Sequence, residues 1–316
     1  IVFGDWSSDV CSSDLGMQIY SKGAVTLTSV RARENDQTGV SVDACVLYGG
    51  NCQGTGTVTI NSPASAGESA ANDFSSNGNY GLYVESFGAI SLSNFKANDN
   101  ASMFVGVLLD NDNGGSSAGI TVSATIADYK NQTNNNGSYG MQIRTNGNVS
   151  LAKLTAAENA SDGANIDNDA AVKNVSVSDS SFYLNEGHGL RIASQGNVTL
   201  TNTSAHDNDP AEVGSKHGLS ITGTGTGSGT ISLKSTSSSV AYDFGNNSGT
   251  GIYVYNWKGA VSIKSVTADW NGDNGVLVEN DASVTPKPVT LANVSARSNT
   301  YYGIFVNSLG VYPRRI

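Results

Sequence analysis

One short pattern recurs along almost the whole chain: a glycine, an apolar residue, any residue and a second apolar residue. It opens at eleven positions, Gly16, Gly39, Gly81, Gly106, Gly140, Gly163, Gly189, Gly218, Gly251, Gly275 and Gly303. Apolar residues that alternate with others have the period of a β-strand. One complete unit, Gly140–Asp162, has room for three short strands and three turns. Because so small a unit cannot bury its own apolar face, copies of it are predicted to stack.

An asparagine lies before the next glycine in every interval between these openings. The ten asparagines are Asn35, Asn77, Asn100, Asn131, Asn159, Asn185, Asn208, Asn246, Asn271 and Asn299. Glycine and asparagine accept positive φ angles at little cost, which suits the corners of each unit. In a stack, each asparagine lies beside the same corner of the next unit and can hydrogen-bond to it. The sequence therefore predicts a structural asparagine ladder.

The spacing of this repeat is similar to that of a known family. Six units read Asn-x-x-x-Gly-apolar-x-apolar, beginning at Asn35, Asn77, Asn159, Asn185, Asn271 and Asn299. This resembles the right-handed parallel β-helix repeat proteins of the pectate-lyase-like superfamily. The resemblance implies an all-β fold, a right-handed single-stranded parallel β-helix of about ten rungs. It implies little about activity, because the family includes lyases, hydrolases, epimerases, adhesins and phage spikes.

Residues 1–15 do not follow the repeat. The segment Asp5–Leu15, DWSSDVCSSDL, resembles the translation of a common sequencing adapter, so we treat 1–15 as a non-native leader. The β-helix domain is predicted over 16–316. Repeat arrays need polar caps at their ends, and no capping element is visible in the sequence. We therefore expect a fragment that is truncated at both ends.

Composition and charge indicate where such a protein acts. The chain has 17 Lys and Arg against 27 Asp and Glu, a formal net charge of −10. This disfavours nucleic acid and anionic membranes as partners. No segment suggests direct membrane insertion, and abundant Ser, Thr, Asn and Gly are typical of secreted β-solenoids. We expect an extracellular or cell-surface bacterial protein, and nothing in the sequence predicts its oligomeric state.

Two cysteines remain outside the leader, and both follow the strand that opens at Gly39. Cys45 and Cys52 are close enough in the chain for a local disulfide, which an oxidising compartment would preserve. The alternative is a pair of free thiols.

Charged and aromatic side chains occupy the outward positions of the first strand in many units. The candidate ligand-binding face comprises Asp43, Tyr83, Glu85, Asp110, Arg144, Asp167, Arg191, Tyr253 and Tyr255. Carboxylates, arginine and aromatic rings on one face suit a polysaccharide or other glycan, through hydrogen bonds and ring stacking. The alternative is an ordinary solvated strand face.

No cofactor is predicted, although two acidic turns are candidates for Ca²⁺. Their carboxylates belong to Asp110, Asp112, Asp167 and Asp169, and oxygen-rich turns of this type hold Ca²⁺ in other proteins. Asx-turns have the same composition and are the alternative.

The sequence contains no arrangement of residues to which catalytic roles can be assigned. His188 and His217 both precede a rung-opening glycine, which predicts a stacked aromatic column more than an acid–base site. Because the repeat is regular throughout, we expect a non-catalytic stalk, adhesin or carbohydrate-contacting module. The alternative is a polysaccharide lyase or hydrolase on the same fold.

Overall fold

The computed structural model describes residues 14–45, 47–48, 51–52, 54–63, 71–101, 103–112, 116–211, 214–223, 229–236, 242–280 and 287–308. Most of the leader, 1–13, lies outside this set, so the adapter hypothesis is not tested. The chain divides into two compact units, Ile1–Ile166 and Asp167–Ile316. Each is described by itself.

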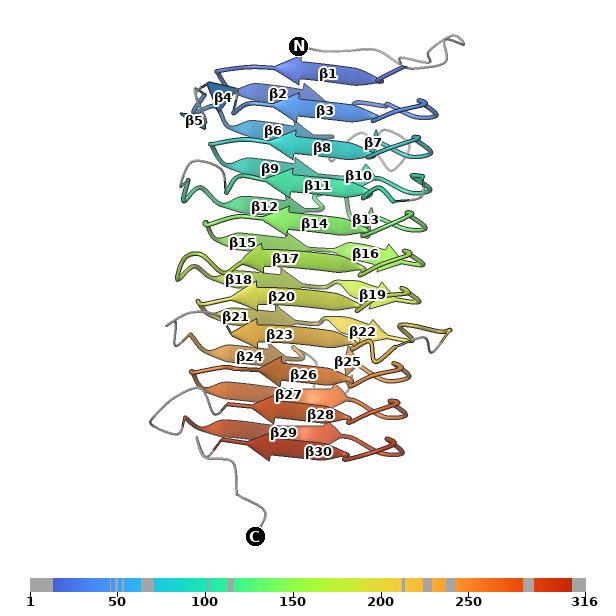
Figure 1. The fold of residues 1–316 in the computed structure, drawn as a ribbon, viewed down its shortest axis with the longest axis vertical. Helices are drawn as coiled ribbons and strands as arrows, with labels where there is room; N and C mark the ends of the chain where they lie inside the picture. Colours follow the sequence, from blue (N-terminus) through green and yellow to red (C-terminus); the bar gives the residue numbers. More distant parts are fainter. Residues whose placement is uncertain are drawn as a thin grey trace. The chain divides into compact units, whose positions relative to one another are not determined.

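Unit 1 consists of short parallel strands in three sheets (Figure 1). Sheet A contains β1 (Met17–Tyr20), β3 (Val40–Asp43), β8 (Leu82–Glu85), β11 (Val107–Asp110) and β14 (Met141–Arg144). Sheet B contains β2 (Val25–Thr28), β6 (Val58–Asn61), β9 (Ile90–Ser93), β12 (Ile120–Ser123) and β15 (Val149–Ala152). Sheet C contains β7 (Asn72–Asp73), β10 (Phe95–Lys96), β13 (Asn131–Gln132) and β16 (Leu154–Ala157). An antiparallel pair, β4 (Leu47–Tyr48) and β5 (Asn51–Cys52), follows β3.

Unit 2 repeats the arrangement. Sheet A contains β20 (Leu190–Ser194), β23 (Leu219–Gly223), β26 (Ile252–Tyr255), β28 (Val276–Glu279) and β30 (Ile304–Asn307). Sheet B contains β18 (Val175–Ser178), β21 (Val198–Thr201), β24 (Ile231–Lys234), β27 (Val261–Thr267), β29 (Val289–Ser295) and β25 (Tyr242–Asp243). Sheet C contains β19 (Ser181–Tyr183) and β22 (Ser204–His206). Strand β17 (Ala164–Asn168) contains the boundary between the units.

Each unit is a parallel β-helix, as the repeat predicts. Consecutive rungs pair in register, so that Val40, Leu82 and Val107 are direct neighbours across three strands. The first and third residues of the sheet A strands point inward, and Leu82 and Val84 are fully buried. Each fully buried side chain of this type stabilises the fold by about 1.5–3 kcal/mol relative to exposure. Stacked apolar columns therefore form the core.

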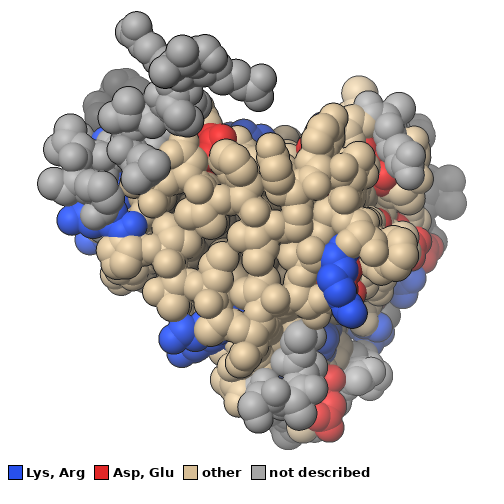
Figure 2. All heavy atoms as spheres, turned by 90° about the horizontal axis from the view of Figure 1, so that it is seen from below, with Lys and Arg blue, Asp and Glu red and all other residues tan. Residues whose placement is uncertain are grey.

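The last described rung shows that a rung depends on the rung beside it. Ile304, Phe305 and Val306 of β30 are exposed, because no described strand lies beyond them. Figure 2 looks onto this end of unit 2 and shows a surface made mostly of uncharged residues. A rung thus buries its apolar residues only when another rung covers it.

The asparagine ladder is present in both units. In unit 1, side-chain Nδ2 groups donate to Oδ1 of the next asparagine in the order Asn35, Asn77, Asn100, Asn136 and Asn159, over 2.7, 3.2, 2.8 and 3.0 Å. In unit 2 the order is Asn185, Asn208, Asn247, Asn271 and Asn299, over 3.0, 2.9, 3.0 and 3.0 Å. Each Oδ1 acceptor also receives the backbone N–H of the preceding ladder residue, as at Asn136 and Asn159. These buried polar groups are therefore satisfied between rungs.

Two of the ten predicted ladder residues are wrong. Asn131 begins β13 and accepts the backbone N–H of Phe95 at 3.1 Å, whereas Asn136 takes its place in the ladder. Asn246 is exposed, and its neighbour Asn247 is the ladder residue. The spacing Asn-x-x-x-Gly selects the right residue in both rungs, because Gly140 and Gly251 follow Asn136 and Asn247 at that distance.

The reason expected for the glycines is also wrong. None of the rung-opening glycines whose surroundings are described has a positive φ angle. They are required by close contact: a Cβ atom on Gly81 would lie 2.7 Å from Nδ2 of Asn100. Positive φ angles, between 53° and 63°, occur instead at the residue before each ladder asparagine: Glu34, Ser76, Asp99, Asn135, Glu158, Leu184, Asp207, Asn246, Trp270 and Ser298. Asparagine and aspartate tolerate this conformation, whereas larger side chains such as those of Leu184 and Trp270 are strained there.

Candidate functional site

Three carboxylates of the predicted ligand-binding face, Asp43, Glu85 and Asp110, form an acidic column on the outer face of sheet A in unit 1. Strand register makes direct neighbours of Asp43, Glu85, Asp110 and Arg144, in that order. Tyr83 lies on the same face, two residues before Glu85. The structure thus brings together five of the nine predicted face residues, all from consecutive rungs of one unit.

Most of these charged groups have partners within the protein. The hydroxyl of Tyr83 donates to Oε2 of Glu85 at 2.9 Å, and Asp43 Oδ1 accepts the backbone N–H of Cys45 at 2.9 Å. Arg144 Nη1 lies 3.7 Å from Asp110 Oδ2. This pairing reduces the repulsion expected between stacked carboxylates. It also leaves the acidic column less available to a ligand than the sequence indicates.

Asp110 is the most perturbed carboxyl group of the column. Its side chain is almost completely buried, with 8% of the residue exposed. Burial, and then the nearby negative charge of Asp112, raise the pKa of Asp110 to about 6. Burial and the bond to Glu85 likewise raise the pKa of Tyr83. Asp110 therefore titrates at a higher pH than an ordinary aspartate.

The turn after Asp110 has the geometry of an Asx-turn, which is the alternative to a Ca²⁺ site. Asp110 Oδ1 accepts the backbone N–H of Asp112 at 3.2 Å, which is an Asx-turn contact. The backbone oxygen of Asp169, in unit 2, accepts a hydrogen bond from the side-chain amide of Gln195. Within the described residues no group of three or more His, Cys, Asp or Glu is placed to hold a metal ion. Ca²⁺ binding by Asp110, Asp112, Asp167 and Asp169 stays a prediction.

A row of rings in unit 2 begins just before strands β20 and β23 and continues onto the outer face of sheet A at β26. The ring centroids of His188 and His217 are 5.0 Å apart, those of His217 and Tyr253 are 4.6 Å apart, and those of Tyr253 and Tyr255 are 5.9 Å apart. Tyr255 is 44% exposed at the end of the row. Arg191 belongs to the same column as Tyr253, with Ser220 between them. The predicted residues Arg191, Tyr253 and Tyr255 thus share one surface.

The two histidines of this row are held neutral. The backbone N–H of His217 donates to His188 Nδ1 at 2.8 Å, and that of Thr250 donates to His217 Nδ1 at 3.0 Å. Burial, and then nearby cationic groups, lower the pKa of His188 to about 4. Burial and His188 lower the pKa of His217 to about 3. Both imidazoles therefore serve as stacked rings and hydrogen-bond acceptors at neutral pH, as the predicted aromatic column requires.

Comparison with known proteins gives one match. A family model described as a right-handed β-helix region matches residues 63–258. The chain belongs to this family. No curated protein and no solved structure matches it. Membership of the right-handed β-helix family confirms the predicted fold and leaves the activity to be argued from the surfaces.

Two further findings concern the cysteines and membrane-spanning helices. Cys45 is disulfide-bonded, but the side chain of Cys52 lies outside the described residues, so their pairing stays a prediction. No helix in the described part of the chain is long and apolar enough to cross a bilayer.

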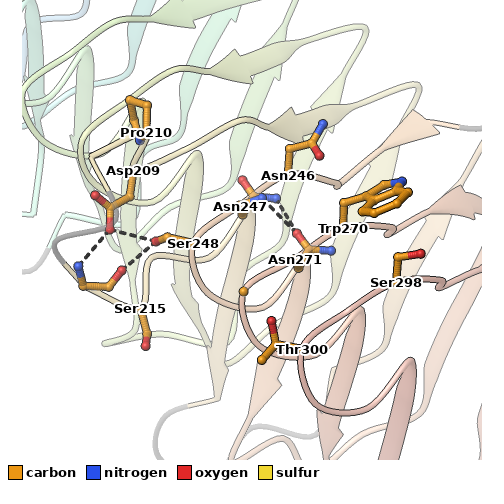
Figure 3. A pocket seen from close by; sticks show the side chains of 12 residues that line it. Asp209, Pro210, Ser215, Asn246, Asn247, Ser248, Trp270, Asn271, Ser298 and Thr300 are labelled. Carbon is orange, nitrogen blue, oxygen red and sulfur yellow. Dashed lines mark hydrogen bonds between the residues drawn. The ribbon is translucent and has the colours of Figure 1, made fainter.

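A polar groove on the turns of unit 2 was not predicted (Figure 3). It has a volume of about 680 Å³ and is lined by Asp209, Pro210, Gly214, Ser215, Asn246, Asn247, Ser248, Trp270, Asn271, Gly272, Ser298 and Thr300. Trp270, 66% exposed, forms one wall. An indole among Asn, Gly and Asp at a turn position was the one signal in the sequence that could have indicated this groove.

Proposed function

We propose that this right-handed β-helix is a secreted or cell-surface protein that binds glycan without cleaving it. The observation that carries the proposal is the row of rings on sheet A of unit 2, which ends at the exposed Tyr255. Tyrosine rings present an apolar face for a sugar ring and a hydroxyl group for hydrogen bonding. Arg191, exposed in the same column as Tyr253, adds a donor for hydroxyl or carboxylate groups.

The chemistry of the chain supports a location outside the cytoplasm. Cys45 is disulfide-bonded, and disulfides persist mainly in oxidising compartments. The net charge of −10 opposes binding to nucleic acid and to anionic lipid. A stalk or adhesin role fits a rigid stack of rungs held by buried hydrogen bonds.

A binding experiment with a matched control tests the proposal. The full chain is run by affinity electrophoresis against acidic and neutral polysaccharides, together with the variants Tyr255→Ala and Ser176→Ala. Ser176 faces outward from β18 in sheet B, so its loss leaves the aromatic row intact. We expect retention by at least one polysaccharide, weakened at least tenfold by Tyr255→Ala alone. No retention, or equal retention by all three proteins, contradicts the proposal.

A second function, polysaccharide cleavage, is favoured by one observation. Asp110 has a pKa of about 6 beside the guanidinium of Arg144, and a raised carboxyl pKa suits a general acid or base near neutral pH. The same panel is therefore assayed for new reducing ends and unsaturated products. Product formation by the wild-type chain that is lost in Asp110→Asn would replace the binding proposal with this one.

A further inference from the structure

The groove of unit 2 is built from turns that follow one another at fixed spacing. The backbone N–H of Gly272 donates to the carbonyl of Asn247 at 2.8 Å, and that of Thr300 donates to the carbonyl of Asn271 at 3.0 Å. Neighbouring rungs in such a stack are about 4.8 Å apart. Equivalent side chains therefore recur at a regular interval along the groove, which suits a ligand that is itself a chain of repeated units.

The wall formed by Trp270 is not explained by folding. Its φ angle is 63°, in the left-handed region that disfavours large side chains, and 66% of the residue is exposed. The same position in the neighbouring rungs holds Asn246 and Ser298, which are small and polar. Within the described residues the indole makes no hydrogen bond and no contact with another aromatic ring, so we look for its partner outside the chain.

The polar groups of the groove fall into two sets. Asn247 and Asn271 belong to the ladder, and Asp209 Oδ2 already accepts Ser248 Oγ at 2.7 Å and the N–H of Gly214 at 3.0 Å. These groups form a rigid floor.

The second set is open to a ligand. Asn246, Ser298 and Thr300 are exposed, and their side chains make no hydrogen bond to any other described residue. Figure 3 shows Asn246 and Ser298 on either side of the indole of Trp270. One amide and one hydroxyl group therefore flank the indole ring, and the hydroxyl group of Thr300 lines the same groove.

The charge of the groove selects among ligands. None of the described residues that line it is Lys or Arg, and its single carboxylate belongs to the buried Asp209. A ligand with carboxylate or sulfate groups would find no counter-charge there. A neutral ligand with many hydroxyl groups and apolar C–H faces matches both the Trp270 indole and its polar neighbours.

We propose that this groove is a second glycan site, and that it takes a segment of a neutral polysaccharide. The face of one sugar ring stacks on the Trp270 indole, while Asn246, Ser298 and Thr300 hydrogen-bond to hydroxyl groups of that sugar and its neighbours. This inference rests on the proposed glycan-binding function, but the site differs from the aromatic row of sheet A.

Indole fluorescence provides a direct test. Trp257 is buried and donates its Nε1–H to Gly229, so it is shielded from a ligand. The Trp6→Phe variant of the full chain removes the leader indole and leaves Trp270 as the exposed reporter. This protein is titrated with maltohexaose, cellohexaose and mannohexaose, and with hexagalacturonate as the anionic comparison. Affinities are confirmed by calorimetry.

We expect at least one neutral hexasaccharide to bind and to shift the emission to shorter wavelength. Trp270→Ala should weaken that binding at least tenfold, which corresponds to about 1.4 kcal/mol, and Trp270→Phe should weaken it less. The matched control is Tyr301→Ala, an exposed aromatic residue of the neighbouring turn that does not line the groove. It should bind as the parent does.

Three outcomes would overturn the inference. These are the absence of binding by all three neutral hexasaccharides, unchanged affinity in Trp270→Ala, and tighter Trp270-dependent binding of hexagalacturonate. Loss of binding in Tyr255→Ala without loss in Trp270→Ala would reject the groove and keep the proposed function. Circular dichroism melts of every variant exclude unfolding as the cause.

Discussion

The backbone N–H of His217 donates a 2.8 Å hydrogen bond to Nδ1 of His188 on the preceding rung. The acceptor must be an unprotonated nitrogen, so this bond requires a neutral His188. His217 is held in the same way by the N–H of Thr250. The two imidazoles stack at 5.0 Å and have lowered pKa values of about 4 and about 3. Stacking and hydrogen bonding between rungs thus depend on one protonation state.

The first prediction is that acid destabilises the protein through this pair. An unfolded histidine has a pKa of about 6.5, so between pH 6.5 and 4 the unfolded chain binds protons that folded His188 and His217 do not. Stability is therefore lost as pH falls through this window, by on the order of 2 kcal/mol for each histidine. Chemical denaturation at pH 7 and pH 4.5 measures the loss. The double variant His188→Asn, His217→Asn keeps side-chain acceptors that do not titrate, and an equally steep loss in that variant would contradict the explanation.

The second prediction concerns Asp110, whose effect has the opposite sign. Its folded pKa of about 6 is above the ordinary aspartate value, so the folded state binds a proton more tightly than the unfolded state. This contribution to stability is fully present below about pH 4 and is lost as pH rises through 6. Asp110→Asn should therefore become more stabilising, relative to the wild type, between pH 4.5 and 7, by on the order of 1 kcal/mol. A difference that does not change with pH would show that Asp110 has an ordinary pKa.

The third prediction distinguishes the two adjacent asparagines Asn246 and Asn247. Asn247→Ala removes a buried donor and acceptor of the ladder, so the backbone N–H of Asn208 loses its Oδ1 acceptor and Oδ1 of Asn271 loses one of its two donors. We expect a loss of about 1–3 kcal/mol in the free energy of unfolding. Asn246→Gly changes an exposed residue to one that accepts its φ angle of 54°, so its stability should stay within about 0.5 kcal/mol of the wild type. Similar values for both variants would remove Asn247 from the ladder.

The fourth prediction concerns backbone strain at Leu184. This residue precedes the ladder residue Asn185 with a φ angle of 56° and is 38% exposed. Asparagine tolerates this conformation better than leucine, so Leu184→Asn should raise the melting temperature, with a gain of about 1 kcal/mol. Leu184→Val introduces a β-branched side chain and should lower it. Differential scanning calorimetry measures the melting temperatures of both variants. A higher melting temperature for Leu184→Val than for Leu184→Asn would show that apolar contact outweighs strain at this position.

Most of the fold could be predicted because every rung repeats one pattern. Apolar residues such as Leu82 and Val84 are buried and their neighbours point outward, which is a local property of strands with a period of two. Register followed as well, since Asp43, Glu85, Asp110 and Arg144 are aligned wherever their glycines are aligned.

The errors arose where the chain between strands varies in length. Asn131 begins β13 and Asn136 lies in the turn after it, and in the sequence only the distance to Gly140 distinguishes them. The reason for the glycines was predicted wrongly because it is close contact with an asparagine of another rung. Such a contact cannot be found by considering one rung alone.

The binding surfaces were less predictable than the fold. The acidic column was found, but its internal hydrogen bonds, such as that between Tyr83 and Glu85, depend on side-chain conformations. The groove beside Trp270 combines residues from turns up to 91 positions apart, from Asp209 to Thr300. Their alignment depends on the lengths of three intervening rungs.

The ladder has a direction. From Asn35 to Asn159, and again from Asn185 to Asn299, every side-chain amide donates toward the C-terminal neighbour. Among the described residues, the buried Oδ1 of Asn35 and the buried Nδ2 of Asn299 are accordingly the ladder atoms that have no partner. The amide dipoles of each unit therefore add head to tail along its axis. A rung can extend such a stack in one orientation only, because a reversed rung would place donor against donor or acceptor against acceptor.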